Sequence, residues 1–308
     1  TKRGTDILGD KAFAASTGIK VLRGNYSEME SSGMDLSLNS RNLKGALKWQ
    51  SNFMLSIVHD RVTVYEVTQP NNIYYIGVYN GNPLVDKPVY GIYSYKWAGL
   101  DPLNGDPRGY LKGEISTNYK GIFDETSIAD LEYNGPARPT IFGALNNSFS
   151  FKNFTLGINL IYKFGYFFRK PSVNYYDMYN DILGNNMNAD FGRRWQKPGD
   201  ENITNIPSMP NYSNSDNGRD RFYNGSSATV AKGDHIRLQD ISLGYDFDKS
   251  NWKGIPISHL QLFIYANNLG VLWKANNFGL DPDVNPGTAD RFSNPLPKSF
   301  SFGVKASF

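Results

Sequence analysis

The sequence has no cysteine among its 308 residues, which excludes disulfides and thiol chemistry but leaves the cellular compartment open. It also lacks any run close to the roughly 18 consecutive apolar residues of a transmembrane helix. The formal net charge is only +3 and the basic residues are scattered, which argues against nucleic acid as a partner. No secretory signal peptide is visible, so for an exported protein we expect a processed chain or, preferably, a fragment.

Aromatic residues are abundant instead, with 20 Tyr and 19 Phe beside a mean hydropathy of −0.48. Transmembrane β-barrels combine these properties because lipid-facing and lumen-facing side chains alternate along each strand. The clearest alternating segment is Phe154 to Phe164, with apolar residues at even positions and mostly polar ones at odd positions. Ten steps of ~3.3 Å, tilted by ~40°, rise about 25 Å, the height of a barrel's apolar band. Strands of soluble sandwiches are about half as long.

Similar alternation predicts several further strands. They are Met34–Asn39, Leu47–Ile57, about Thr140–Phe151, Asp234–Phe247, His259–Leu269 and Lys298–Phe308. Within Asp234–Phe247 the apolar positions change parity near Gln239 and Asp240, which a β-bulge would reconcile. The last strand ends on Phe308. A terminal aromatic residue that closes an alternating strand resembles the assembly signal of bacterial outer-membrane barrels, and we assign that role to Phe308.

The predicted connections differ greatly in length. Phe151–Phe154 and Asp248–Ser258 are short, whereas Trp97–Pro139 and Tyr166–Gly233 are long, polar and rich in Gly, Pro, Asn and Asp. Outer-membrane barrels have short periplasmic turns and long external loops. If the C-terminus is periplasmic, counting strands backwards places both long segments outside the cell.

Two regions leave the local structure open. Between Val58 and Val89 the alternation is unclear, so Ile73–Tyr79 and Tyr90–Trp97 could form an extra hairpin or belong to a third external loop. In the second long segment, Ser172 could cap a short helix that runs to Leu183.

Aromatic residues in the long segments are the candidate contacts for a substrate or for a lid-forming partner. They are Trp97, Tyr175, Tyr176, Tyr179, Trp195 and Tyr212. Rings stack on apolar ligand faces while neighbouring amides satisfy polar edges, which suits sugars or peptides. The alternative is that these rings pack the loop against itself, because a loop this long needs a core of its own.

Catalytic and metal sites find no support in the sequence. The three histidines lack ligand spacing; His235 and His259 could approach across paired strands, but we expect a barrel-lining histidine. Asp281, Asp283, Asn285 and Asp290 hint at calcium. However, Pro286 and Phe292 stand where a calcium loop needs Gly and Glu. We therefore expect no catalysis, no cofactor and no metal, and leave calcium undecided.

Short motifs follow one another in an order that matches a known family. They are Asn25–Met29, Tyr93–Pro102, Asn104–Pro107, Phe149–Phe154, Arg194–Asp200, His235–Tyr245, Asn267–Leu269, Gly279–Asp283 and Pro295–Lys298. Together they resemble the SusC/RagA-type family of TonB-dependent transporters of the Bacteroidota outer membrane, and Arg194–Asp200 is the most specific match. Met34–Asp35 departs from the pattern, since the family usually has a Val before the acidic residue.

The resemblance implies an all-β fold, an antiparallel transmembrane barrel of about 22 strands closed by an N-terminal plug. Residues 1–308 would supply its C-terminal part, about 8–10 strands with long external loops and minor helix. The plug and earlier strands would be a separate chain. The resemblance also implies import of oligosaccharides or peptides across the outer membrane, with a SusD-like surface lipoprotein and with TonB. A passive porin or a surface binding or adhesion barrel remains the alternative.

Overall fold

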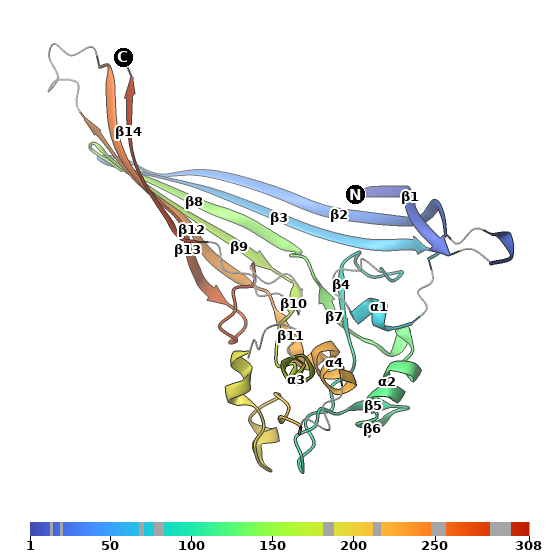
Figure 1. Ribbon diagram of the computed structural model, residues 1–308. Coiled ribbons are helices and arrows are strands. Elements are labelled where there is room, and N and C mark those ends of the chain that lie inside the picture. Colours follow the sequence, from blue (N-terminus) through green and yellow to red (C-terminus); the bar gives the residue numbers. More distant parts are fainter. Residues whose placement is uncertain are drawn as a thin grey trace.

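The computed structural model describes residues 1–12, 15–18, 21–67, 71–76, 83–180, 188–211, 217–247, 257–283 and 297–307. It consists of one long curved sheet and a compact loop domain at one end of the strands (Figure 1). We define the loop domain as the described residues within 71–139 and 166–233. None of the described helices is long and apolar enough to cross a bilayer.

The sheet contains eight strands, each antiparallel to its neighbours. In sheet order they are β1 (Lys2–Ala12), β2 (Val21–Lys44), β3 (Leu47–Tyr65), β8 (Ile141–Phe151), β9 (Phe154–Phe164), β12 (His235–Phe247), β13 (His259–Lys274) and β14 (Ser299–Ser307). The predicted all-β, antiparallel architecture is therefore confirmed. The strands β1 and β14 form the two edges, so the described sheet is an open wall.

The structure agrees closely with the prediction for the middle and last strands. β9 has the predicted bounds, and β8 and β12 each begin one residue later than predicted. β14 also begins one residue later, and its described part ends at Ser307. The predicted bulge is present, because the register shifts between Leu238 and Asp240 against both neighbouring strands. In contrast, β2, β3 and β13 are longer than expected, and β1 was not predicted. Phe308 lies outside the described residues, so its assembly role stays a prediction.

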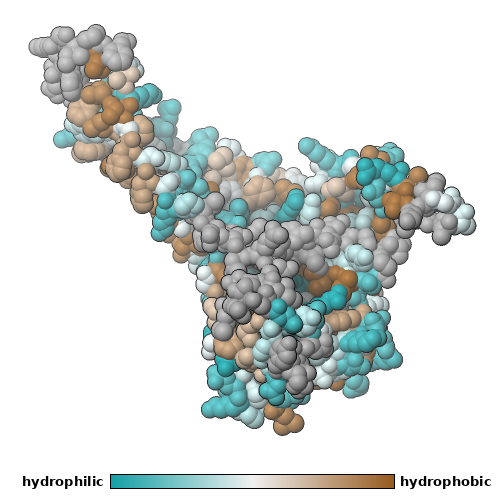
Figure 2. All heavy atoms as spheres, viewed as in Figure 1, coloured by the Kyte–Doolittle hydropathy of each residue, from teal (hydrophilic) through white to brown (hydrophobic). Residues whose placement is uncertain are grey.

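One face of the wall is apolar across successive strands. Directly paired residues share a face of a sheet. One level of this face carries Leu38, Phe53, Leu145, Leu160 and Leu238 on five neighbouring strands. Hydrophobic residues gather along the arm that carries the C-terminal strands, whereas hydrophilic residues cover much of the loop domain (Figure 2). We call this face the lipid face, because apolar rows of this kind face the acyl chains in membrane barrels.

Aromatic rings border the lipid face at both ends. Near the short turns these rings are Trp49, Phe149, Phe154 and Tyr245. Toward the loop domain they are Tyr162, Phe164 and Trp273. Two aromatic levels that flank an apolar band are typical of barrel strands at the two membrane interfaces.

The loop domain is built from short elements. Its strand pairs are β4 (Gly91–Ser94) with β7 (Glu132–Pro136), β5 (Gly109–Leu111) with β6 (Glu114–Ser116), and β10 (Phe167–Arg169) with β11 (Val230–Lys232). Its α-helices are α1 (Ile73–Ile76), α2 (Tyr119–Glu125), α3 (Tyr175–Tyr179) and α4 (Asn217–Gly225). The 3-10 turns are η2 (Ile128–Asp130), η3 (Ala189–Arg193), η4 (Asp200–Asn202) and η6 (Ser227–Thr229), while η1 (Ala15–Thr17) lies outside the domain.

Both long segments leave the sheet at the end opposite the short turns and the last residues of β14 (Figure 1). This arrangement agrees with the predicted placement on one side. The region left open between Val58 and Val89 also becomes clear. Ile73–Ile76 is helical and Gly91–Ser94 pairs with β7, so these described residues do not pair with each other. Because β3 pairs directly with β8, both segments lie in the same connection as Trp97–Pro139, not in a separate third loop.

The predicted helix cap at Ser172 is wrong. The helix α3 begins at Tyr175, and the side chain of Asn174 accepts the capping hydrogen bond from the Asp177 N–H. The Ser172 hydroxyl donates instead to the Asp190 carboxylate at 2.6 Å. The described part of the helix ends at Tyr179, and Leu183 lies outside the described residues.

Candidate functional site

A row of polar side chains, most of them amides, crosses the face opposite the lipid face, and we call it the amide row. Successive paired residues at one level are Asn39, Asn52, Asn146, Asn159, Asp240, Asn267 and Ser299. Neighbours in this row bond to one another: Asn52 donates to Asn39 at 2.5 Å, and Asn159 donates to Asp240 at 3.0 Å. We call this face the luminal face.

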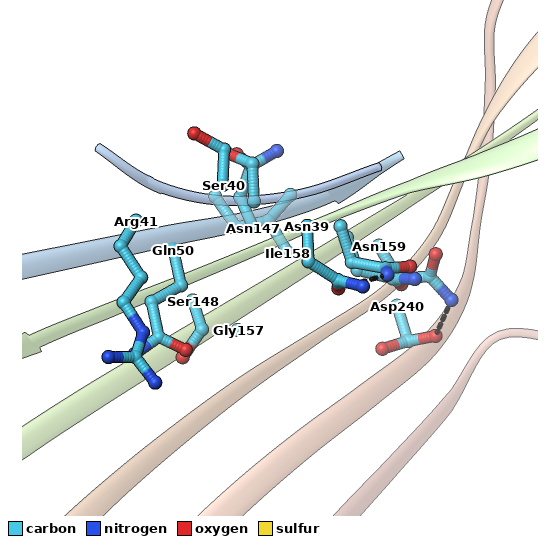
Figure 3. A pocket seen from close by; sticks show the side chains of 13 residues that line it. Asn39, Ser40, Arg41, Gln50, Asn147, Ser148, Gly157, Ile158, Asn159 and Asp240 are labelled. Atoms are coloured by element: carbon cyan, nitrogen blue, oxygen red, sulfur yellow. Dashed lines mark hydrogen bonds between the residues drawn. The ribbon is translucent and has the colours of Figure 1, made fainter. Parts of the chain in front are cut away.

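A hollow of about 550 Å³ lies along the same row (Figure 3). Among the described residues that line it, only Arg41 and Asp240 are charged; Asn, Ser and Gln supply most of the rest. An amide offers both donors and an acceptor, so such a surface can bond hydroxyl or peptide groups in either sense. Because the groups are almost all neutral, each hydrogen bond to a polar solute contributes only about 0.5–1.5 kcal/mol.

A charged cluster stands where the luminal face meets the loop domain. We call it the mouth cluster: Lys163, His235, Arg237, Asp281 and Asp283. Asp283 accepts from Lys163 at 2.6 Å, from His235 Nε2 at 3.1 Å and from Arg237 Nε at 3.1 Å. Arg237 also pairs with Asp281 at 2.5 Å. The cluster ties the segment after β13 to β9 and β12, and so holds that segment over the luminal face.

The electrostatics of the mouth cluster favour an ionised carboxylate. Burial alone would raise the pKa of Asp283. The hydrogen bonds from His235 and Lys163 outweigh burial and hold that pKa well below its ordinary value. The less favoured possibility, that His235 and His259 approach each other across paired strands, is wrong. His235 pairs with Lys274, while His259 lies at the other end of the same two strands.

Two of the four oxygen ligands suggested for calcium have other partners. Asp281 and Asp283 are occupied by the cations of the mouth cluster, and Asn285 and Asp290 lie outside the described residues. Within the described ranges, no group of three or more His, Cys, Asp or Glu could hold a metal ion.

The aromatic candidates lie mainly inside the loop domain. Tyr175 is 1% exposed and Trp195 is 7% exposed. The Tyr175 hydroxyl donates to the Pro207 carbonyl at 2.8 Å, and the Trp195 indole donates to Glu201 at 3.1 Å. Gly105, with a φ of 73°, lies so close to the Trp195 ring that a Cβ would overlap it. These two rings therefore form the packed interior that the sequence analysis gave as the alternative.

The remaining candidates are partly exposed. Trp97 is half-buried, with its ring 6.4 Å from Phe222 and 5.9 Å from Tyr223. Tyr176 and Tyr179 are also half-buried. Tyr212 lies outside the described residues. Contact of any of the six aromatic residues with a substrate or a lid stays a prediction.

Helix α4 carries a buried carboxylate that predicts a pH dependence of the loop domain. Asp220 is 2% exposed and accepts the Tyr176 N–H at 2.7 Å. Burial raises the pKa of Asp220 to about 6. The folded domain then binds this proton more tightly than the unfolded chain does. The resulting stabilisation is complete below about pH 4 and is lost as the pH rises toward 6, by about 3 kcal/mol.

Hydrogen exchange of the α4 amides in the full protein, corrected for intrinsic rates, measures this loss between pH 4.5 and 7. Asp220→Asn keeps an acceptor for the Tyr176 N–H but cannot ionise, so its protection is expected to be flat with pH. Asp190 has the opposite sign: burial would raise its pKa, but bonds from Lys170 and Ser172 hold it below its ordinary value. The contribution of Asp190 to stability therefore changes with pH only below the chosen pH range. Equal pH dependence of protection in the unmodified protein and in the Asp220→Asn variant would contradict the assignment of this effect to Asp220.

Comparison with known proteins shows what this chain is similar to. The TonB-dependent receptor P3 of Formosa agariphila is 22% identical over 335 residues, covering 98% of this chain and 31% of the relative. The chain of the RagAB peptide transporter superposes with a TM-score of 0.71 at 18% identity, covering 99% of this chain and 32% of that one. The resemblance to the SusC/RagA-type family is confirmed. No protein-family model matches the chain.

Two further structures of this SusC/RagA-type fold extend the comparison. The RagAB peptide importer superposes with a TM-score of 0.72 in its open-open state and 0.70 in its closed-closed state. The wall is therefore part of an outer-membrane β-barrel. These proteins are named as a receptor and as importers, not as enzymes, in agreement with the expected lack of catalysis. The chain spans about a third of the length of these relatives.

The amide row and the mouth cluster were missed by sequence reasoning. Strand parity places each of their wall residues on the luminal side. What parity cannot supply is the register, which brings Asn39, Asn146 and Asn267 to one level although they are far apart in the chain.

Proposed function

We propose that this chain is the C-terminal part of the barrel of a TonB-dependent importer in the outer membrane. It takes up oligosaccharides or peptides together with a SusD-like surface lipoprotein. The observation that carries the proposal is a wall with one apolar face, one polar face rich in amides and a folded domain at its outer end. A plug and the earlier strands, from the rest of the protein, complete the barrel, and TonB acts through that part.

The proposed path uses the two faces differently. The lipid face anchors the wall in the membrane through its apolar rows and aromatic borders. The substrate passes along the luminal face, where amides exchange hydrogen bonds with it and with water. The half-buried rings of Trp97, Tyr176 and Tyr179 are the proposed contacts at the outer end, for the substrate or for the lipoprotein. This chain changes no covalent bond and needs no cofactor.

Uptake is expected to stop when TonB is removed. Because the proposed plug closes the barrel until TonB pulls on it, uptake of a labelled oligosaccharide or peptide by whole cells should fall to the level of cells that lack this protein. Restoring TonB should restore uptake. Uptake that is unchanged without TonB would indicate a passive porin. Surface binding with no uptake in either strain would indicate a binding or adhesion barrel.

A further inference from the structure

A second cavity, of about 760 Å³, lies between the loop domain and the segment after β13. Lys170 and residues 192–206 line it from the loop domain, and Phe278 lines it from the segment after β13. The mouth cluster holds that same segment over the luminal face through Asp281 and Asp283. The cavity therefore lies at the mouth of the barrel, on the luminal side of the wall.

The cavity is positively charged. Lys170, Arg193, Arg194 and Lys197 line it, whereas Asp200 is the only acidic residue among its described lining. Lys170 and Arg193 share the carboxylate of Asp190, at 2.7 and 2.5 Å. Four cations thus face two carboxylates.

Two of the cations keep their charge available. No described residue forms an ion pair with Arg194 or Lys197. The Asp200 carboxylate is engaged by the backbone N–H groups of Gln196 and Lys197, at 2.9 and 3.1 Å. The Arg194 guanidinium is held in place, 3.9 Å from the centre of the Phe191 ring, with one N–H on the Phe191 carbonyl. A guanidinium fixed in this way is prepared for a carboxylate, whose two oxygens match its paired N–H groups.

The lining also has an apolar part, beside the polar side chains of Gln196, Thr204, Asn205 and Tyr223. Ile203, Ile206, Ala228 and Phe278 contribute to it, and Phe278 is 37% exposed. Carboxylate-binding cations beside aliphatic and aromatic surface suit an acidic peptide, which has both carboxylates and apolar side chains. An acidic sugar would leave the aliphatic part of this surface against hydroxyl groups, which costs desolvation.

We infer that this cavity binds a carboxylate of a peptide substrate, with Arg194 and Lys197 as its charged partners. The inference rests on the proposed function and narrows it to peptides that carry acidic groups. It also gives the cavity a place on the import path, since Phe278 belongs to the segment that the mouth cluster holds over the luminal face.

Binding to the full transporter, purified with its lipoprotein, tests the inference. The probes are a ten-residue peptide of alternating Glu and Ala with an amidated C-terminus, the same amidated peptide with Gln in place of Glu, and tetragalacturonate. We expect the Glu peptide to bind about tenfold more tightly than the Gln peptide at 50 mM salt, and the difference to shrink at 500 mM. Lys197→Glu should remove most of the difference and leave the Gln peptide unaffected.

Two further variants test whether the charge of Arg194 and Lys197 is responsible. Arg194→Gln combined with Lys197→Gln should act like Lys197→Glu; if Arg194 is needed for folding, the single Lys197 variant still decides. Lys96→Glu is the matched control, because Lys96 is an exposed lysine of the same domain that lines a different cavity. It should behave as the unmodified protein does.

Three results would overturn the inference. Equal affinity for the Glu and Gln peptides, with both taken up in a TonB-dependent manner, refutes the charge preference and leaves the proposed function standing. Equal loss of affinity in the Lys96 and Lys197 variants refutes the site. Tighter binding of tetragalacturonate than of the Glu peptide refutes the peptide class. Absence of TonB-dependent uptake for any solute would refute the proposed function itself.

Discussion

Leu160→Lys is expected to remove most of the protein from the outer membrane. Leu160 lies near the middle of β9, in the apolar row with Leu145 and Leu238. A lysine near the midplane of the lipid face of a barrel costs about 2–4 kcal/mol. Since about 1.4 kcal/mol is a factor of ten in an equilibrium, the folded and inserted fraction should fall by more than about tenfold. Immunoblots of outer-membrane fractions, with a heat-modifiability gel to report folding, measure it.

The neighbouring position provides the control. Asn159 follows the opposite face, and its amide donates to Asp240 at 3.0 Å. In Asn159→Lys an ammonium replaces the amide beside that carboxylate, on the wet side of the wall, so abundance should remain close to normal. Equal loss in the two variants would mean that the faces are not distinguished by lipid. Normal abundance of both would place β9 outside the membrane.

The strands that sequence reasoning predicted well are those whose whole length lies within the lipid band. In β9 each even-numbered residue must be apolar, because lipid covers one face from end to end. The strand β2 has 24 residues, which at ~3.3 Å per residue and a tilt of ~40° rises about 60 Å, far more than that band. Beyond the band both faces meet water or protein, and alternation disappears. This explains why only Met34–Asn39 was predicted from β2, and why β1 was missed.

The loop domain was harder to predict because its contacts join distant residues. Composition indicated that aromatic residues are important in the long segments, either for binding or for packing. It could not tell Trp195, which packs on Gly105, from Tyr176, which is partly exposed. The same holds for the mouth cluster, in which Lys163 and Asp283 meet only after the register of β9, β12 and β13 is set.

Arg169→Met is expected to unfold the loop domain locally while the wall stays in the membrane. Arg169 is 6% exposed, and burial lowers the pKa of its guanidinium to about 10. No described carboxylate pairs with it. Its N–H groups donate instead to acceptors on three parts of the domain: the carbonyls of Tyr93, Asn224 and Ser226 and the hydroxyls of Ser94 and Thr229.

The methionine side chain fills similar space but donates nothing, so these acceptors, three of them backbone carbonyls, lose the Arg169 donor in the domain interior. At about 1 kcal/mol for each acceptor, the loss is about 3–5 kcal/mol, a large part of the stability of a small domain. Hydrogen exchange in the full transporter should show lost protection at Gly91–Ser94 and at residues 224–229, with the strands of the wall unchanged. Arg221→Met, which replaces an exposed arginine of α4, is the matched control and should keep protection. If Arg169→Met keeps the same protection as Arg221→Met, carbonyl dipoles around one buried guanidinium do not hold this domain together.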